Sequence, residues 1–157
     1  MVIQVYVVRE KVFTYSGVFD LKEFIDYIKG WFEKYDYDIL EKEYFDKSVD
    51  IKSTQIKWEC DRKLDDYHQY FLQIKIKIDN YQEVTQHGKK LVKGDFTFLT
   101  DAYVEKDYLE NWKKGPIRRF ARSVFDKFIM EQKETEVEKQ LKDDAEDLYS
   151  EVKKYFS

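Results

Sequence analysis

Hydrophobic and polar residues alternate without a break along residues 70–79, YFLQIKIKID. Successive side chains of a β-strand point to opposite faces, so this pattern predicts a strand with one apolar and one polar face. The apolar face holds Tyr70, Leu72, Ile74, Ile76 and Ile78. Runs rich in β-branched and aromatic residues predict four more strands, over residues 2–19, 39–45, 54–64 and 91–107.

The connections between these strands are also visible in the pattern. The first strand is expected to bend or break near Arg9 to Lys11, where charged residues interrupt an apolar run. Polar and turn-forming residues predict turns over residues 46–53, 65–66 and 79–90. No helical pattern interrupts residues 39–104, and such short connections favour an antiparallel meander.

A repeat of three to four residues predicts a helix over residues 21–35. Asp20 and Glu23 form a capping box at its start. Its apolar stripe consists of Leu21, Phe24, Ile25, Ile28, Trp31, Phe32 and Tyr35. Gly30 interrupts a run of good helix formers, and we expect it to allow close packing against a sheet.

A second helical pattern begins at Pro116, because proline is well tolerated at the first position of a helix and Gly115 precedes it. Its apolar stripe consists of Ile117, Phe120, Ala121, Val124, Phe125 and Phe128. Past Met130 the chain is rich in Glu and Lys and keeps only a narrow apolar seam. We call this set the seam: Val137, Leu141, Ala145, Leu148 and Val152. The pattern does not decide whether residues 117–157 form one helix or two.

These elements give the order β-α-β-β-β-β-α. We expect a two-layer α+β domain in which a curved antiparallel sheet of about five strands is covered by an N-terminal helix and a long C-terminal helical segment. The element order resembles that of the START-like lipid-binding superfamily, which implies a helix-grip-like arrangement with the sheet wrapped around the last helix. We divide the chain into one domain over residues 1–130 and a charged amphipathic helical extension over residues 131–157.

Composition narrows the class of protein. A chain of 157 residues is one domain's worth, and 28 aromatic residues exceed what a small core needs. One cysteine cannot form an internal disulfide, which fits a reducing compartment, and the apolar run at residues 2–8 is too short to span a membrane and lacks a cleavage site. We expect a cytoplasmic protein. The net charge of −4 argues against binding nucleic acid through the molecule as a whole.

Candidate catalytic residues are few. We expect Cys60 to pack in the core beside Trp58, and we expect His68 and His87 to be ordinary exposed histidines, because neither has a partner at metal-ligand spacing. The strand glutamates Glu41, Glu43 and Glu59 are expected to face solvent. The sequence contains no phosphate-binding loop, nucleophile elbow or zinc-protease motif. We therefore predict no catalytic residue, metal or cofactor.

The most specific local feature is a basic cluster at the start of the second helix. It consists of Lys113, Lys114, Arg118, Arg119 and Arg122. On a helical wheel the arginines lie opposite Phe120 and Val124, and a helix start offers free amide donors, so this cluster could bind an anion or an acidic partner. A solvated helix face is the plainer interpretation. Lys75 and Lys77 would extend such a surface only if they lie close to these arginines.

Three functions remain open. The first is a non-catalytic interaction or assembly module that uses its C-terminal helices, through the seam, to bind a protein partner or a second copy of itself. The second is a helix-grip-like carrier of a small apolar ligand in a cavity between the sheet and the C-terminal helix. The third is phosphate or nucleic-acid binding by residues 113–122.

Overall fold

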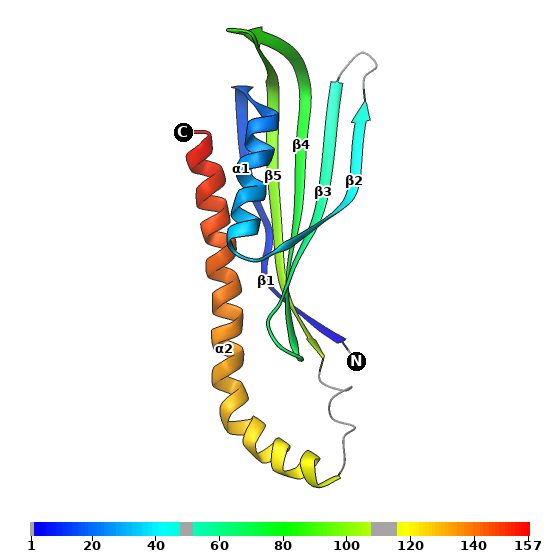
Figure 1. The fold of residues 1–157 in the computed structure, drawn as a ribbon, viewed down its shortest axis with the longest axis vertical. Helices are drawn as coiled ribbons and strands as arrows, with labels where there is room; N and C mark the ends of the chain where they lie inside the picture. Colours follow the sequence, from blue (N-terminus) through cyan, green and yellow to red (C-terminus); the bar gives the residue numbers. More distant parts are fainter. Residues whose placement is uncertain (1, 48–51, 108–115) are drawn as a thin grey trace.

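The computed structural model describes residues 2–47, 52–107 and 116–157, and within these ranges it describes all side chains except those of residues 43–47, 107 and 116–134. Five strands and two helices follow the expected order: β1 (Val2–Phe19), α1 (Leu21–Lys34), β2 (Asp38–Lys47), β3 (Lys52–Lys63), β4 (His68–Gln86), β5 (Lys89–Asp107) and α2 (Pro116–Tyr155). The strands form one antiparallel sheet in the order β1-β5-β4-β3-β2, so the predicted two-layer α+β fold is confirmed (Figure 1).

Both helices pack on one face of the sheet, which we call the inner face. The ring of Phe96 on β5 lies 5.0 Å from that of Phe24 on α1 and 4.6 Å from that of Phe156, just beyond α2. The alternating residues of β4 form part of this face, because Tyr70, Leu72, Ile74, Ile76 and Ile78 are all at most 2% exposed. Burial of this apolar surface supplies most of the driving force for folding.

Strand β1 is irregular between Val8 and Lys11, as expected from its charged interruption. Glu10 adopts a left-handed backbone conformation with φ of 49°, and its amide donates a hydrogen bond of 2.6 Å to the Asp101 carboxylate on β5. The bulge is therefore held by a side chain of the neighbouring strand, which explains why the chain can continue as one strand on either side of it.

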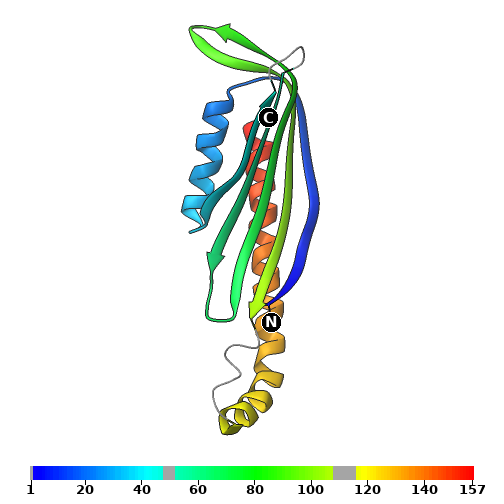
Figure 2. The same ribbon diagram turned by 90° about the vertical axis from the view of Figure 1, so that its right-hand side faces the viewer.

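The turn predicted over residues 79–90 is wrong in extent. Strand β4 continues to Gln86, and the tight turn lies at His87 and Gly88, which have φ of 51° and 77°. Residues 79–82 form a bulge instead, with Asn80 at φ of 52°. Asparagine adopts the left-handed backbone conformation more readily than most residues, and this conformation occurs in bulges as well as in turns. The β4–β5 hairpin consequently extends past the other strands (Figure 2).

Helix α1 begins as predicted, because the Asp20 side chain accepts a hydrogen bond of 3.1 Å from the Glu23 amide. Its buried residues are Phe24, Ile28, Trp31 and Phe32. The expectation for Gly30 is wrong: the position is exposed, and a Cβ atom added there would meet nothing within 4 Å. The close contact with the sheet is made by the opposite side of the helix.

Helix α2 is one continuous helix of 40 residues, so the chain does not break at residue 130. The seam belongs to the same hydrophobic core as the sheet, and its members are at most 8% exposed. The first turns of α2 extend past the end of the sheet, whereas the second half lies along it (Figures 1 and 2). The narrow seam suits a helix that contacts only one surface.

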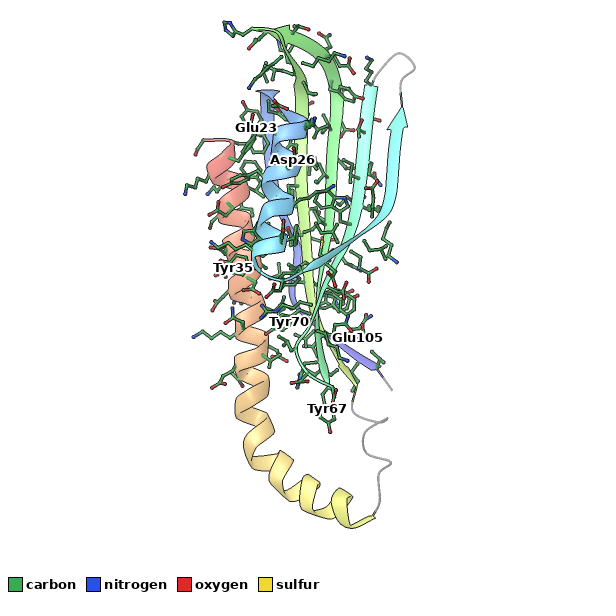
Figure 3. The ribbon with its side chains drawn as sticks, in the orientation of Figure 1. Glu23, Asp26, Tyr35, Tyr67, Tyr70 and Glu105 are labelled. Carbon is green, nitrogen blue, oxygen red and sulfur yellow. The ribbon has the colours of Figure 1, made fainter. Side chains whose placement is uncertain are left out.

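Polar contacts fix α2 against α1. Three carboxylates of α2, at Asp144, Asp147 and Glu151, accept hydrogen bonds from aromatic side chains at or after α1. The donors are Tyr37 to Asp144 at 2.8 Å, Trp31 to Asp147 at 2.8 Å, Tyr35 to Asp147 at 3.1 Å, and Tyr27 to Glu151. In Figure 3, Tyr35 lies at the end of α1 beside α2. The helices thus share one polar interface above the apolar core.

Candidate ligand-binding site

The second face of the sheet, which we call the outer face, has no described helix packed against it (Figure 2). Its residues are those that alternate with the core positions along each strand. On β3, β4 and β5 they are mostly half-buried, because neighbouring side chains cover one another. Open faces of antiparallel sheets are usually polar, and here the polar residues are arranged around a hollow.

A groove of about 350 Å³ lies on this outer face. It crosses four strands and is lined by Lys42, Lys57, Trp58, Glu59, Gln73, Ile74, Lys75, Leu99 and Asp101. The side chains of Trp58 and Ile74 belong to the inner core, so it is their backbone that forms part of the groove floor. The groove is at the small end of the range of ligand-binding pockets.

Strand register sorts the groove lining into two rows. In the first row Lys57 of β3 lies directly opposite Lys75 of β4, and Lys75 lies opposite Leu99 of β5. In the second row Glu59 lies opposite Gln73, and Gln73 lies opposite Asp101. The groove therefore has a basic side that ends at an apolar residue and an acidic, hydrogen-bonding side.

The carboxylates of the groove already have donors. Glu59 forms an ion pair of 3.0 Å with Lys42, and the Tyr103 side chain lies close to it. Burial raises the pKa of Tyr103 to about 12, and the neighbouring carboxylates of Glu59 and Glu105 add to this effect. Asp101 is held by the Glu10 amide of the β1 bulge.

An aromatic cluster borders the acidic side of the groove. The rings of Phe71 and Tyr103 are stacked with centroids 4.9 Å apart, and the ring of Tyr6 lies 5.1 Å from that of Tyr103. The guanidinium of Arg9 lies 4.1 Å from the centre of the Tyr6 ring, a cation–π contact. These packed side chains form the border of the groove beside Glu59.

None of the residues of the basic cluster predicted from the sequence is among those that line this groove. Lys113 and Lys114 fall outside the described residues. Arg118, Arg119 and Arg122 lie in the first turns of α2, and their side chains are also outside the described part of the chain. Lys75 and Lys77 belong to the outer face, opposite to the face on which α2 packs.

The seam residues lie in the core of their own domain: Val137, Leu141, Ala145, Leu148 and Val152. In this conformation they face the sheet, so a second helix cannot pack on them. The described part of the sheet–helix interface is filled by side chains such as Phe24, Phe98 and Leu148, all 0% exposed.

The histidine prediction is half wrong. His87 is exposed as expected, but His68 is only 1% exposed. Its Nδ1 lies 3.0 Å from the Asp65 carboxylate, and it pairs across the sheet with Lys106, which forms an ion pair of 3.0 Å with Glu138 of α2. The sequence missed this burial because a helix about seventy residues further along the chain covers the position.

The other candidate residues lie largely as expected. Cys60 is fully buried, and burial raises the pKa of its thiol, which makes it a poor nucleophile. Glu41 is exposed and Glu59 is half-buried, while the side chain of Glu43 is outside the described residues. Among the described residues no group of three or more potential ligands is placed to hold a metal ion. Within the same residues no helix is both long and apolar enough to cross a membrane.

Of the groove residues, the sequence indicated Glu59 and Lys75 as candidates, but it did not identify the groove or bring these two residues together. The signal was present as alternating polar residues on β3, β4 and β5, but the groove depends on which residues face each other across strands. Comparisons of the chain with protein-family models, with curated proteins and with solved structures find no match.

Proposed function

We propose that this protein is a small-molecule-binding module whose binding site is the groove on the outer face of the sheet. The observation that carries the proposal is the groove itself, of about 350 Å³, in a face that no described helix covers. Its lining comes from four adjacent strands rather than from loops. Sites built on strands are held in place before the ligand arrives, which lowers the entropic cost of binding.

The character of the lining favours binding over catalysis. Glu59 is engaged by Lys42, and Asp101 by the Glu10 amide. Carboxylates held in this way are suited to fix the orientation of a ligand, because moving a proton through them would break existing contacts. Gln73 lies between them and offers both a donor and an acceptor.

A pair of matched variants tests the proposal. Gln73→Trp fills the groove, whereas Gln55→Trp places the same ring on the outer face of β3 outside it. Wild type and both variants are screened by ligand-observed NMR against phosphorylated, carboxylated, cationic and uncharged metabolites. We expect compounds that bind wild type and Gln55→Trp but not Gln73→Trp. Compounds that bind all three proteins equally would place the binding site elsewhere.

The first turns of α2 support a second proposal, which is binding of a protein partner or a second copy through residues 116–128. These turns extend past the sheet in Figures 1 and 2, and their sequence combines an apolar stripe with three arginines. Native mass spectrometry tests self-association. Wild type should appear as a dimer or a larger multiple of the 19.3 kDa monomer, and a variant with Arg118, Arg119 and Arg122 all changed to Glu should be monomeric. A monomeric wild type would exclude the second copy as partner.

A further inference from the structure

We infer that the basic side of the groove binds the phosphate group of a small phosphorylated metabolite, with Lys75 as the principal contact. This inference rests on the proposed function, since it names the ligand class of the same groove. It follows from a comparison of how the acidic and the basic groups of the outer face are partnered.

Four carboxylates of the outer face have donors. Glu59 and Asp101 are engaged as described above, and Asp61 accepts a hydrogen bond of 2.9 Å from Gln69. Asp95, at the far end of the face, accepts from Ser16 at 2.8 Å and from Asn80 at 3.3 Å. A cationic ligand would therefore have to displace contacts that already exist.

The lysines of the groove are not all partnered: Lys42 pairs with Glu59 and Lys57 also has a partner, whereas Lys75 has none among the described residues. Lys57 and Lys75 are direct cross-strand partners on one face, and Lys77 follows on the same face of β4. Lys75 makes no ion pair with any residue in the described part of the chain, although it is half-buried. An anion bound at the Lys75 ammonium would supply the counter-charge that this side chain lacks among the described residues.

The surroundings specify the anion further. A lysine ammonium donates charge-assisted hydrogen bonds to phosphate oxygens, so the Lys75 side chain can bind one phosphate group. Leu99 lies beside Lys75 and gives an apolar contact for the body of the ligand. Gln73, Glu59 and Asp101 lie one row away and can accept hydrogen bonds from hydroxyl groups. The size of the groove suits a small polyol phosphate.

Isothermal titration calorimetry tests the inference on the full chain, at constant ionic strength set with chloride. The probes are inorganic phosphate, glycerol 3-phosphate and uncharged glycerol. We expect glycerol 3-phosphate to bind more tightly than inorganic phosphate and glycerol not to bind. Lys75→Gln should weaken phosphate binding by about tenfold to a hundredfold, the range for losing a charge-assisted hydrogen bond.

Lys139→Gln is the matched control, because it removes the same charge from an exposed position on α2. Equal weakening by both variants would show a general charge effect and overturn the inference. So would equal binding of glycerol and glycerol 3-phosphate, or no saturable binding of either phosphate probe in the millimolar range. None of these outcomes affects the Gln73→Trp test, so failure of the inference can be distinguished from failure of the proposed function.

We expect the Lys75→Gln variant to fold, so a loss of phosphate binding would not be due to unfolding. Lys75→Gln removes a like-charge cross-strand pair without changing the length of the side chain greatly, so the ligand-free variant should be at least as stable as wild type. A thermal melt of the ligand-free proteins checks this before titration.

Discussion

The polar contact between Tyr37 and Asp144 is the most buried of those that join α1 and α2. The Tyr37 hydroxyl lies 2.8 Å from the carboxylate, and the two residues are 4% and 2% exposed. Tyr37→Phe leaves this buried carboxylate with one donor fewer, so the free energy of unfolding should fall by about 1–3 kcal/mol. Urea denaturation measures the change.

Tyr27→Phe is the control for that prediction. Tyr27 also donates to a carboxylate of α2, at Glu151, but it is 39% exposed, and water replaces the lost contact. The free energy of unfolding should stay within about 0.5 kcal/mol of wild type. An equal loss in both variants would show that burial does not set the strength of these contacts.

Buried tyrosines also make stability depend on pH. Burial raises the pKa of Tyr70 to about 12, with a further contribution from Asp144, and burial raises the pKa of Tyr37 as well. Above pH 10 the unfolded chain loses these protons while the folded chain keeps them, so the free energy of unfolding should fall as the pH rises from 10 toward 12. Below pH 10 both states are protonated, and these residues should have no effect.

Tyr70→Phe separates this effect from other alkaline changes. The variant lacks one titrating group, although it also loses the 2.6 Å hydrogen bond from Tyr70 to the Val137 carbonyl. It should be less stable than wild type at neutral pH, but its stability should fall less steeply above pH 10. Urea denaturation at several pH values gives both slopes, and identical slopes would contradict the assignment.

At the scale of single residues, the sequence predicted what local pattern determines. Cys60 and the alternating residues of β4 are buried because their strand has one apolar face. His68 could not be predicted, because its burial comes from α2 and its contact with Asp65 from a turn. The opposition of Lys57 and Lys75 depends on register, which a single strand does not specify.

Two glycines test the account of the elements. A Cβ atom at Gly94 would lie 2.7 Å from the Tyr81 Cβ and 3.0 Å from the Asp79 carbonyl oxygen, so Gly94 allows β5 to approach the β4 bulge. Gly94→Ala should lower the free energy of unfolding by about 1–3 kcal/mol through overpacking. Gly30→Ala, at an exposed helix position with open space, should raise it by about 0.5–1 kcal/mol. Chemical denaturation of both variants measures the two signs, and a neutral Gly94→Ala would contradict the close approach.

The existence and order of the elements could be predicted because each has a clear period. The ends of the elements were harder to predict where one residue type is common in two structures. Asn80 is such a residue, because asparagine occurs in turns and in bulges. Only the pairing of Gln82 with Lys93 beyond it shows that β4 continues. Gly30 likewise lies on the exposed side of α1, where the pattern of apolar residues does not show whether another element packs.

At the scale of the molecule, the second half of α2 is part of the core. Leu148 is fully buried, so Leu148→Ala should lower the free energy of unfolding by about 2–5 kcal/mol. Glu146→Ala, at an exposed position two residues away, should change it by no more than about 0.5 kcal/mol. Circular dichroism and tryptophan fluorescence should report one shared transition.

Separate transitions for helix and sheet in Leu148→Ala would instead support a detachable extension after residue 130. The sequence left this question open, because a narrow apolar seam at three- and four-residue spacing fits a helix packed on its own sheet and a helix packed on a partner. The distinction depends on whether the sheet has an uncovered apolar face, which is a property of the whole fold.

In our proposal the outer face of the sheet, rather than α2, binds the ligand. The most direct measurement is a titration with glycerol 3-phosphate followed by ¹H–¹⁵N NMR of the full chain. We predict that the perturbed amides cluster at residues 57–59, 73–75 and 99–101, on three adjacent strands around the groove. Perturbations confined to residues 116–122 of α2, or none at all, would contradict the account.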